Sequence, residues 1–147
     1  MTEIKAEIYE VGRTDEGALV LLQGKNKFNE KVLPILCNPM QGRNIKNGLN
    51  QQTTSRPQTH DLFIEIMNEV GGAIDKITID NAQEGIYFAK IYANTYNNGE
   101  KQISLDARPS DALAIASRER APIYIDHELF EEKGVSPSSL KFESSSN

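Results

Sequence analysis

Alternation of apolar and charged residues near the N-terminus is typical of a half-buried β-strand. Residues 4, 6 and 8 are apolar, whereas residues 3, 5 and 7 are charged, and a period of two places the apolar set on one face. The continuous apolar run at 18–22 is typical of a central strand. A third apolar segment contains Pro34, which indicates a sheet edge, a bulge or a strand end. We therefore expect strands over 3–12, 17–23 and 31–36.

The stretch from 38 to 52 has the least regular pattern in the chain. Met40, Ile45 and Leu49 keep a loose helical spacing. Gly42 and Gly48, together with four asparagines, weaken a helix in this stretch. The pattern leaves two alternatives open, a poor helix or an ordered loop.

Two amphipathic segments predict the main helices. The first follows Arg56-Pro57, has one apolar face and is stopped by Gly71-Gly72. The residues of that face are Leu62, Phe63, Ile66, Met67 and Val70. The second helix begins at Ser110 or Asp111 and continues to about Arg118.

The remaining elements are mostly strands. We expect them over 73–80, 85–96, 101–106 and 122–125, with a hairpin turn at 97–100. A short helix over 127–133 is capped by Asp126 and ended by Gly134. Strands first, then strands mixed with helices, predict an α+β domain. Its sheet is mixed and mostly antiparallel, with two main helices and a short C-terminal helix. Residues 1–135 form the domain, and the Ser-rich residues 136–147 form a flexible tail.

Composition limits the classes of function. At 147 residues the chain is long enough for one ordinary core. The net charge is −5 and the basic residues are scattered, so any nucleic-acid binding would use a local site. A lone Cys37 suits a reducing compartment and excludes an internal disulfide or a Cys-based zinc site. No apolar run is long enough to span a membrane, and no signal region precedes the first strand. These features predict a cytoplasmic protein without a membrane partner.

A short phrase occurs twice, each time directly before a predicted helix. The two copies are Arg56-Pro57-Gln58-Thr59-His60-Asp61 and Arg108-Pro109-Ser110-Asp111. Thr59 and Ser110 are good N-cap residues, and an aspartate in the first turn interacts favourably with the helix dipole. Helix capping alone explains Thr59, Ser110 and the two aspartates without a ligand.

Capping does not explain Arg56, Arg108 or His60. Arginine is disfavoured at a helix N-terminus, so each arginine is expected to pair with a carboxylate across the fold or to bind an anion. His60 is a candidate general base or metal ligand, with a structural hydrogen bond as the alternative. The sharper hypothesis places both helix starts at one cleft. In it, His60 and the aspartates surround an ion while the arginines bind phosphate.

The residues in and around these two phrases resemble the bifunctional nuclease domain family. The resemblance is carried by Arg-Pro-x-Thr-His-Asp-Leu-Phe, by Asp-Ala-Arg-Pro-Ser-Asp-Ala-Leu-Ala-Ile-Ala and by the following Ala-Pro-Ile-Tyr, and it extends from residue 3 to 135. It implies a compact α+β domain, association as a homo-oligomer, and hydrolysis of both DNA and RNA, an activity of some plant members. The positions that match are Arg56, Thr59, His60, Asp61, Asp106, Arg108, Ser110 and Asp111.

One stretch departs from the family pattern. Where the family usually has Glu-Ala, this chain has Gln41-Gly42. If that carboxylate holds a metal or activates water, the protein is impaired or inactive. If it is structural, the change only loosens a helix.

The resemblance and the residues together give a leading hypothesis, a metal-assisted nuclease acting on DNA or RNA. Mg²⁺ or Mn²⁺ would be held by Asp61, Asp106 and Asp111, with His60 as base or ligand and the two phrase arginines on the phosphate. Single-stranded nucleic acid would be the partner. A non-enzymatic homo-oligomeric binding or regulatory module, with structural Arg-Asp pairs, is the alternative. A third reading places a small phosphorylated ligand or nucleotide at the arginines.

Overall fold

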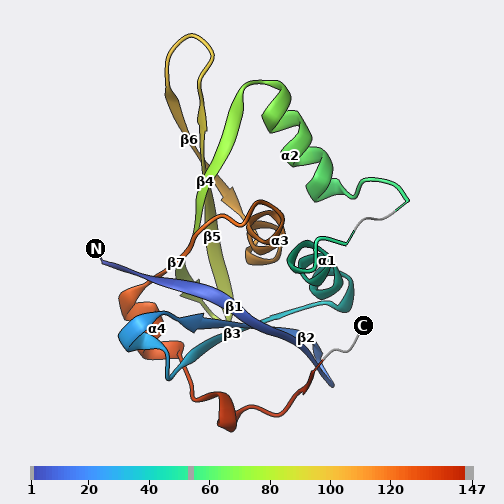
Figure 1. Ribbon diagram of the computed structural model, residues 1–147. Helices are drawn as coiled ribbons and strands as arrows, with labels where there is room; N and C mark the ends of the chain where they lie inside the picture. Colours follow the sequence, from blue (N-terminus) through green and yellow to red (C-terminus); the bar gives the residue numbers. More distant parts are fainter. Residues whose placement is uncertain (1, 53–54, 145–147) are drawn as a thin grey trace.

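A strongly twisted mixed sheet is the framework of the computed structural model, which describes residues 2–52 and 55–144 (Figure 1). Its strands are β1 (Glu3–Thr14), β2 (Gly17–Gly24), β3 (Val32–Cys37), β4 (Gly72–Gln83), β5 (Ile86–Thr95), β6 (Lys101–Ala107), β7 (Ile123–Asp126) and β8 (Glu143–Ser144). The order is β3-β2-β1-β7-β4-β5-β6, with β8 beside β1. Among the described strands, β4 and β7 pair in parallel and the other neighbours are antiparallel.

The strands follow the predicted pattern. The three N-terminal strands are confirmed, and β1 continues two residues beyond the predicted end. Pro34 lies in β3 opposite Leu21, and β3 is an edge of the sheet, where a missing N–H donor is tolerated. The predicted turn between β5 and β6 is confirmed by positive φ angles at Asn98 (60°) and Gly99 (91°). Such angles match the twist of a tight hairpin.

The helices pack against the sheet, and α3 also contacts α1 and α2. They are α1 (Pro39–Leu49), α2 (Thr59–Glu69), α3 (Pro109–Glu119) and α4 (His127–Lys133), with short 3-10 turns η1 (Asn26–Phe28) and η2 (Pro137–Ser139). The two main helices and the short C-terminal helix predicted from the sequence are confirmed as α2, α3 and α4. Helix α1 decides the open alternatives for 38–52 in favour of a helix. The fold is a single α+β domain.

Helix α1 forms despite its glycines because those glycines are its contact points. A Cβ added at Gly42 would lie 2.5 Å from the Ala18 side chain, and one added at Gly48 would collide with the Ser117 hydroxyl of α3. The glycines therefore let α1 approach β2 and α3 closely. Asn38 starts the helix, because its side chain accepts a hydrogen bond from the Gln41 N–H at 2.8 Å.

We expect Gly48→Ala to destabilise the protein by about 1–3 kcal/mol, because the added methyl group overpacks the α1–α3 contact. At a helical position with free space, the same Gly→Ala change would raise the free energy of unfolding by roughly 0.5–1 kcal/mol. Urea denaturation of the purified variant measures the difference. Arg43→Ala, at an exposed position of the same helix, is the matched control and should change the free energy of unfolding by less than about 0.5 kcal/mol. A stabilised Gly48→Ala protein would contradict the packing argument.

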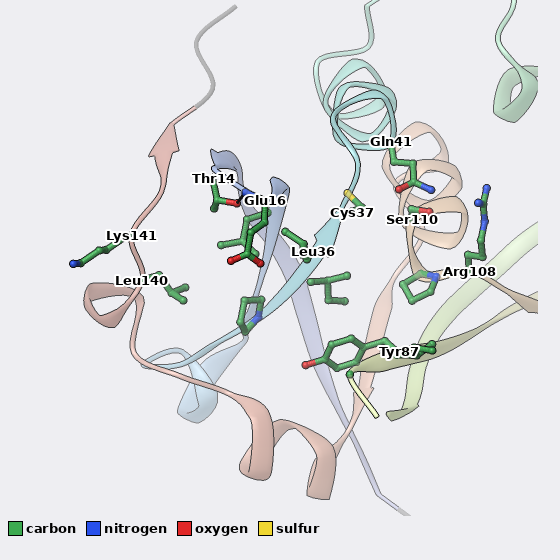
Figure 2. A pocket seen from close by; sticks show the side chains of 16 residues that line it. Thr14, Glu16, Leu36, Cys37, Gln41, Tyr87, Arg108, Ser110, Leu140 and Lys141 are labelled. Carbon is green, nitrogen blue, oxygen red and sulfur yellow. Dashed lines mark hydrogen bonds between the residues drawn. The ribbon is translucent and has the colours of Figure 1, made fainter. Parts of the chain in front are cut away.

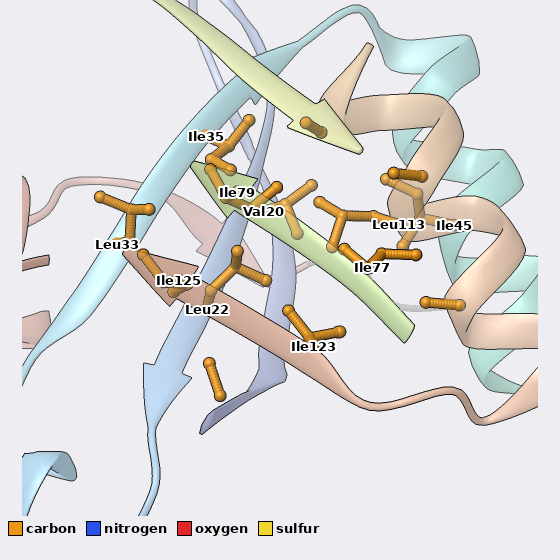
Figure 3. Packing of buried hydrophobic residues seen from close by; sticks show 14 of the residues in the cluster. Val20, Leu22, Leu33, Ile35, Ile45, Ile77, Ile79, Leu113, Ile123 and Ile125 are labelled. Atoms are coloured by element: carbon orange, nitrogen blue, oxygen red, sulfur yellow. The ribbon is translucent and has the colours of Figure 1, made fainter. Parts of the chain in front are cut away.

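The core lies where α1 and α3 cover the sheet (Figure 3). Ile45 of α1 and Leu113 of α3 are fully buried against Val20 and Leu22 of β2 and Ile77 of β4. This cluster joins strands from both halves of the chain. The beginning of α3 is thereby fixed on a rigid support.

Helix α2 is attached differently. None of its residues, all of which the structure describes, is buried, and only Phe63 and Ile64 pack partly against the core. Leu62, Ile66 and Val70 form an exposed stripe. Since apolar burial contributes little here, the polar contacts of its first turn are expected to hold α2 in place.

The described part of the predicted tail contacts the domain. Residues 136–144 contain η2 and β8, and β8 pairs with Gly12 and Arg13 of β1. Residues 145–147 lie outside the described part of the chain. The domain boundary at 135 and the flexibility of the tail stay predictions. Among the described helices, none is long and apolar enough to cross a membrane.

Candidate functional site

The two Arg-Pro phrases meet in space although they are about fifty residues apart in the chain. His60, in the first turn of α2, contacts Asp111, in the first turn of α3, with 2.9 Å between Nε2 and Oδ1. Arg108 binds the same carboxylate, with Nε 2.9 Å from Oδ2 and Nη2 3.4 Å from Oδ1. Asp111 thus joins an imidazole and a guanidinium.

The direction of the hydrogen bond between His60 and Asp111 follows from this geometry. An ionised carboxylate only accepts hydrogen bonds, so Nε2 of His60 donates to Asp111. Nδ1 is buried and has no hydrogen-bond partner within residues 2–52 and 55–144. Nε2 of His60 is therefore occupied by Asp111, and Nδ1 is shielded from solvent.

A second polar cluster surrounds Arg118, near the end of α3. Its Nε donates to Asp61 Oδ1 at 2.7 Å, and its Nη2 donates to Gln58 Oε1 at 2.8 Å. Nη1 donates to the carbonyls of Asn44 and Ala114 at 2.9 and 3.0 Å. The Arg118 side chain is only 9% exposed. This cluster ties the start of α2 to both α1 and α3.

The caps of α2 and α3 differ from the sequence prediction. The N-cap residues are Gln58 and Arg108, so Thr59 is the first residue of α2 and Ser110 the second of α3. Pro109 occupies the first helical position, where its missing N–H carries no penalty, and this moves the cap back to Arg108. The Ser110 hydroxyl is consequently not used as a cap.

The environment of the two aspartates shifts their pKa values. Partial burial alone would raise the pKa of Asp61, but the Gln58 N–H and the Arg118 guanidinium outweigh burial and lower it. For Asp111 burial again opposes ionisation, and the hydrogen bonds from Arg108 and His60 hold the pKa below its usual value. The bound carboxylate in turn raises the pKa of Arg108. Both aspartates are anionic at neutral pH.

We expect acid to remove the stabilisation contributed by Asp61. A lowered pKa means that the contribution is present above the ordinary carboxyl value of 3.8 and is lost as pH falls below it. Asp61→Asn should lower the free energy of unfolding by about 1–2 kcal/mol at pH 6, and the gap to the natural protein should shrink below pH 4. Urea denaturation from pH 6 to 2.5 measures it. The exposed Asp75→Asn control should show a small gap at every pH, and a constant gap for Asp61→Asn would contradict the prediction.

A groove of about 610 Å³ opens on the other side of Arg108 (Figure 2). It lies between the starts of α1 and α3, the β4–β5 turn and the segment after η2. Its polar lining includes Gln41, Arg108, Ser110, Glu16 and Lys141. Burial raises the pKa of the Cys37 thiol, which also lines the groove, to about 11. His60 and Asp111 lie behind Arg108 and are not part of the groove lining.

Comparison with known proteins decides the family. The sequence model of the bifunctional nuclease domain matches residues 20–138. The chain belongs to this family. It is 28% identical over 137 residues to an uncharacterized protein of Mycobacterium tuberculosis, covering 92% of this chain and 77% of that protein. It is 26% identical over 107 residues to bifunctional nuclease 1 of Oryza sativa subsp. japonica and 25% identical over 104 residues to bifunctional nuclease 1 of Arabidopsis thaliana. These matches cover 73% and 71% of this chain but only 32% of either plant protein.

Two of the residues that match the family pattern lie outside the first turns of α2 and α3. Asp106 is in β6 opposite Lys90 of β5, on the face of the sheet opposite to that of Leu105 and the buried Ile91. Arg56 is exposed and precedes α2, next to residues 53–54, which lie outside the described part of the chain. Their predicted roles stay predictions.

The carboxylates do not form a ligand group for a metal ion in this arrangement. No set of three or more His, Cys, Asp or Glu side chains gathers within the described residues. Asp61 is bound to Arg118 and Asp111 to Arg108, so a divalent ion would have to displace a guanidinium from each. The donor set therefore does not suit a resident Mg²⁺ or Mn²⁺, and the predicted ligands stay a prediction.

Arg118 is the residue that sequence reasoning missed. It lies outside both phrases and in the last turn of its helix. One signal was present: Arg118 follows Asp111 by seven residues, which places both on one face of α3. That spacing marks the face of α3 that receives α2.

Proposed function

We propose that the protein hydrolyses phosphodiester bonds of single-stranded DNA and RNA. One observation carries the proposal: Arg108 is held by Asp111, which is held by His60, at the edge of an open groove. Membership of the bifunctional nuclease domain family supports it, as do the plant relatives that are named nucleases.

Arg108 is the residue suited to contact the phosphate. Its side chain is 69% exposed, yet Nε and Nη2 are fixed by the Asp111 carboxylate. The two Nη1 hydrogens and the second hydrogen of Nη2 remain available to donate hydrogen bonds to phosphate oxygens. A guanidinium fixed in advance stabilises the negative charge that develops during cleavage without having to reorganise. Arginine is well matched to the phosphate geometry.

His60 and Asp111 act as positioning residues in this proposal. His60 donates to Asp111, and its other nitrogen is buried, so the imidazole does not reach a substrate proton in this arrangement. Its hydrogen bond instead fixes the Asp111 carboxylate, which in turn orients Arg108. The role of His60 as a general base stays a prediction from the sequence.

The test is cleavage of labelled single-stranded DNA and RNA by the purified protein, with EDTA, with Mg²⁺ and with Mn²⁺. We expect cleavage that survives EDTA, because the carboxylates are already bound to guanidinium groups. Loss in EDTA and recovery with either ion would favour the metal-assisted reaction expected from the sequence. Absence of cleavage under all conditions would overturn the proposed function.

A non-enzymatic binding module is the second candidate. It is favoured by the contact of the nearly buried Arg118 with Asp61, which is a structural use of one Arg-Asp pair, and by Gln41 in place of the expected glutamate. An inactive but folded protein that retains oligonucleotide binding would support it. The expected homo-oligomer also stays a proposal, which light scattering of the purified protein would check.

A further inference from the structure

We propose that the groove beside α3 is a binding site for a nucleoside monophosphate or for the terminal nucleotide of a strand. The phosphate would be held by Ser110, Gln41 and Arg108, and the base would lie along the apolar wall. The site requires binding only, so it goes beyond the hydrolysis proposed above.

Ser110 gives the first indication of a ligand. The residue is only 7% exposed, it lines the groove, and its hydroxyl has no hydrogen-bond partner among the described residues. Ser110 Oγ is not among the buried side-chain atoms that lack a partner in the described residues, so the hydroxyl is accessible from the groove. Its position in the first turn of α3 adds the Ser110 N–H and the positive end of the helix dipole, whereas Pro109 has no N–H and the Asp111 and Ala112 N–H groups donate to the Arg108 carbonyl.

Gln41 supplies a donor from the neighbouring helix. Its Oε1 accepts a hydrogen bond from the Asn38 N–H at 2.8 Å, whereas Nε2 has no partner within the described residues. Figure 2 shows the Gln41 amide and Ser110 on the groove wall that α1 and α3 form. Gln41 therefore presents an amide donor at the groove and places no negative charge beside a bound phosphate.

The charges around the groove suit an anion, although the whole chain is acidic. Arg108 and Lys141 line it, against Glu16 as the one carboxylate among the described lining residues. Burial raises the pKa of both Cys37 and Tyr87, so neither side chain adds negative charge at neutral pH. Because Arg108 is already paired with Asp111, the groove offers an anion directed hydrogen-bond donors rather than a net positive charge.

The apolar part of the groove selects a ligand with a ring. Leu36, Ile86, Tyr87 and Leu140 line it together with Pro34, and Leu36 and Ile86 are exposed. An aromatic side chain beside aliphatic ones offers a stacking surface for a base. The volume of about 610 Å³ lies in the range of small-molecule sites, roughly 300–1,000 Å³.

Isothermal titration calorimetry with adenosine 5′-monophosphate, inorganic phosphate and adenosine tests the site. We expect the monophosphate to bind, phosphate to compete for the same site more weakly, and adenosine to bind at least tenfold more weakly. Gln41→Glu should weaken monophosphate binding at least tenfold. That variant keeps the helix start, because glutamate also serves in a capping box. Gln102→Glu, an exposed position in β6, is the control for net charge and should bind within twofold of the natural protein.

Several results would overturn the site. They are absence of monophosphate binding at millimolar concentration, equal affinity for adenosine, or unchanged affinity in Gln41→Glu when circular dichroism shows a folded protein. The binding and cleavage assays test the two proposals independently. Binding without cleavage would remove the hydrolytic proposal alone, and cleavage without monophosphate binding would remove this site alone.

Discussion

Arg118→Met is expected to lower the free energy of unfolding by about 2–4 kcal/mol. The guanidinium donates to Asp61, Gln58 and two backbone carbonyls while it is almost completely buried. Methionine fills similar space but leaves these acceptors without a donor. The Asp61 carboxylate would lose its charged partner, and unpaired polar groups in a partly buried position are strongly destabilising.

The matched control is Arg13→Met. Arg13 makes an exposed ion pair with Glu143 at 3.8 Å, and such pairs contribute little. We expect a change below about 0.5 kcal/mol, measured by urea denaturation at pH 7 beside Arg118→Met. Equal effects of the two substitutions would show that the Arg118 cluster does not hold α2 in place.

The strands were predictable because each has a short-range signal. Alternation identified β1, the apolar run identified β2, and Asn98-Gly99 supplied the positive φ angles of a tight turn. Helix α1 was not predictable in the same way. Its glycines lower helix propensity, but they also permit close contact with Ala18 and Ser117, and only the tertiary structure shows that contact. Tertiary packing therefore overrides local propensity in α1.

The candidate site was predictable in part for a comparable reason. The doubled phrase pointed to His60, Asp111 and Arg108, which the structure brings together. It did not separate the two aspartates, because one first-turn carboxylate looks like the other in sequence. Only the tertiary structure shows that Asp61 pairs with Arg118 and that Asp111 pairs with Arg108.

The two clusters depend on each other through the position of α2. That helix has little apolar attachment, so the bonds of Arg118 to Asp61 and Gln58 decide where its first turn lies. His60 lies in the same turn and reaches Asp111 from there. Loosening the Arg118 cluster should therefore also loosen the orientation of Arg108. Stability and activity are linked at this point of the fold.

Arg108→Gln should reduce the rate of phosphodiester cleavage by about 10²–10³-fold, the effect of removing one donor that stabilises transition-state charge. Because the side chain is largely exposed, the protein should remain folded, as circular dichroism and thermal unfolding would verify. Arg108→Lys keeps the charge but not the planar fork that binds both Asp111 and phosphate, so we expect partial activity. Arg13→Gln, an exposed arginine in β1, should cleave at the natural rate. Full activity in Arg108→Gln would remove Arg108 from the reaction and leave the His60–Asp111–Arg108 contact as a structural link between α2 and α3.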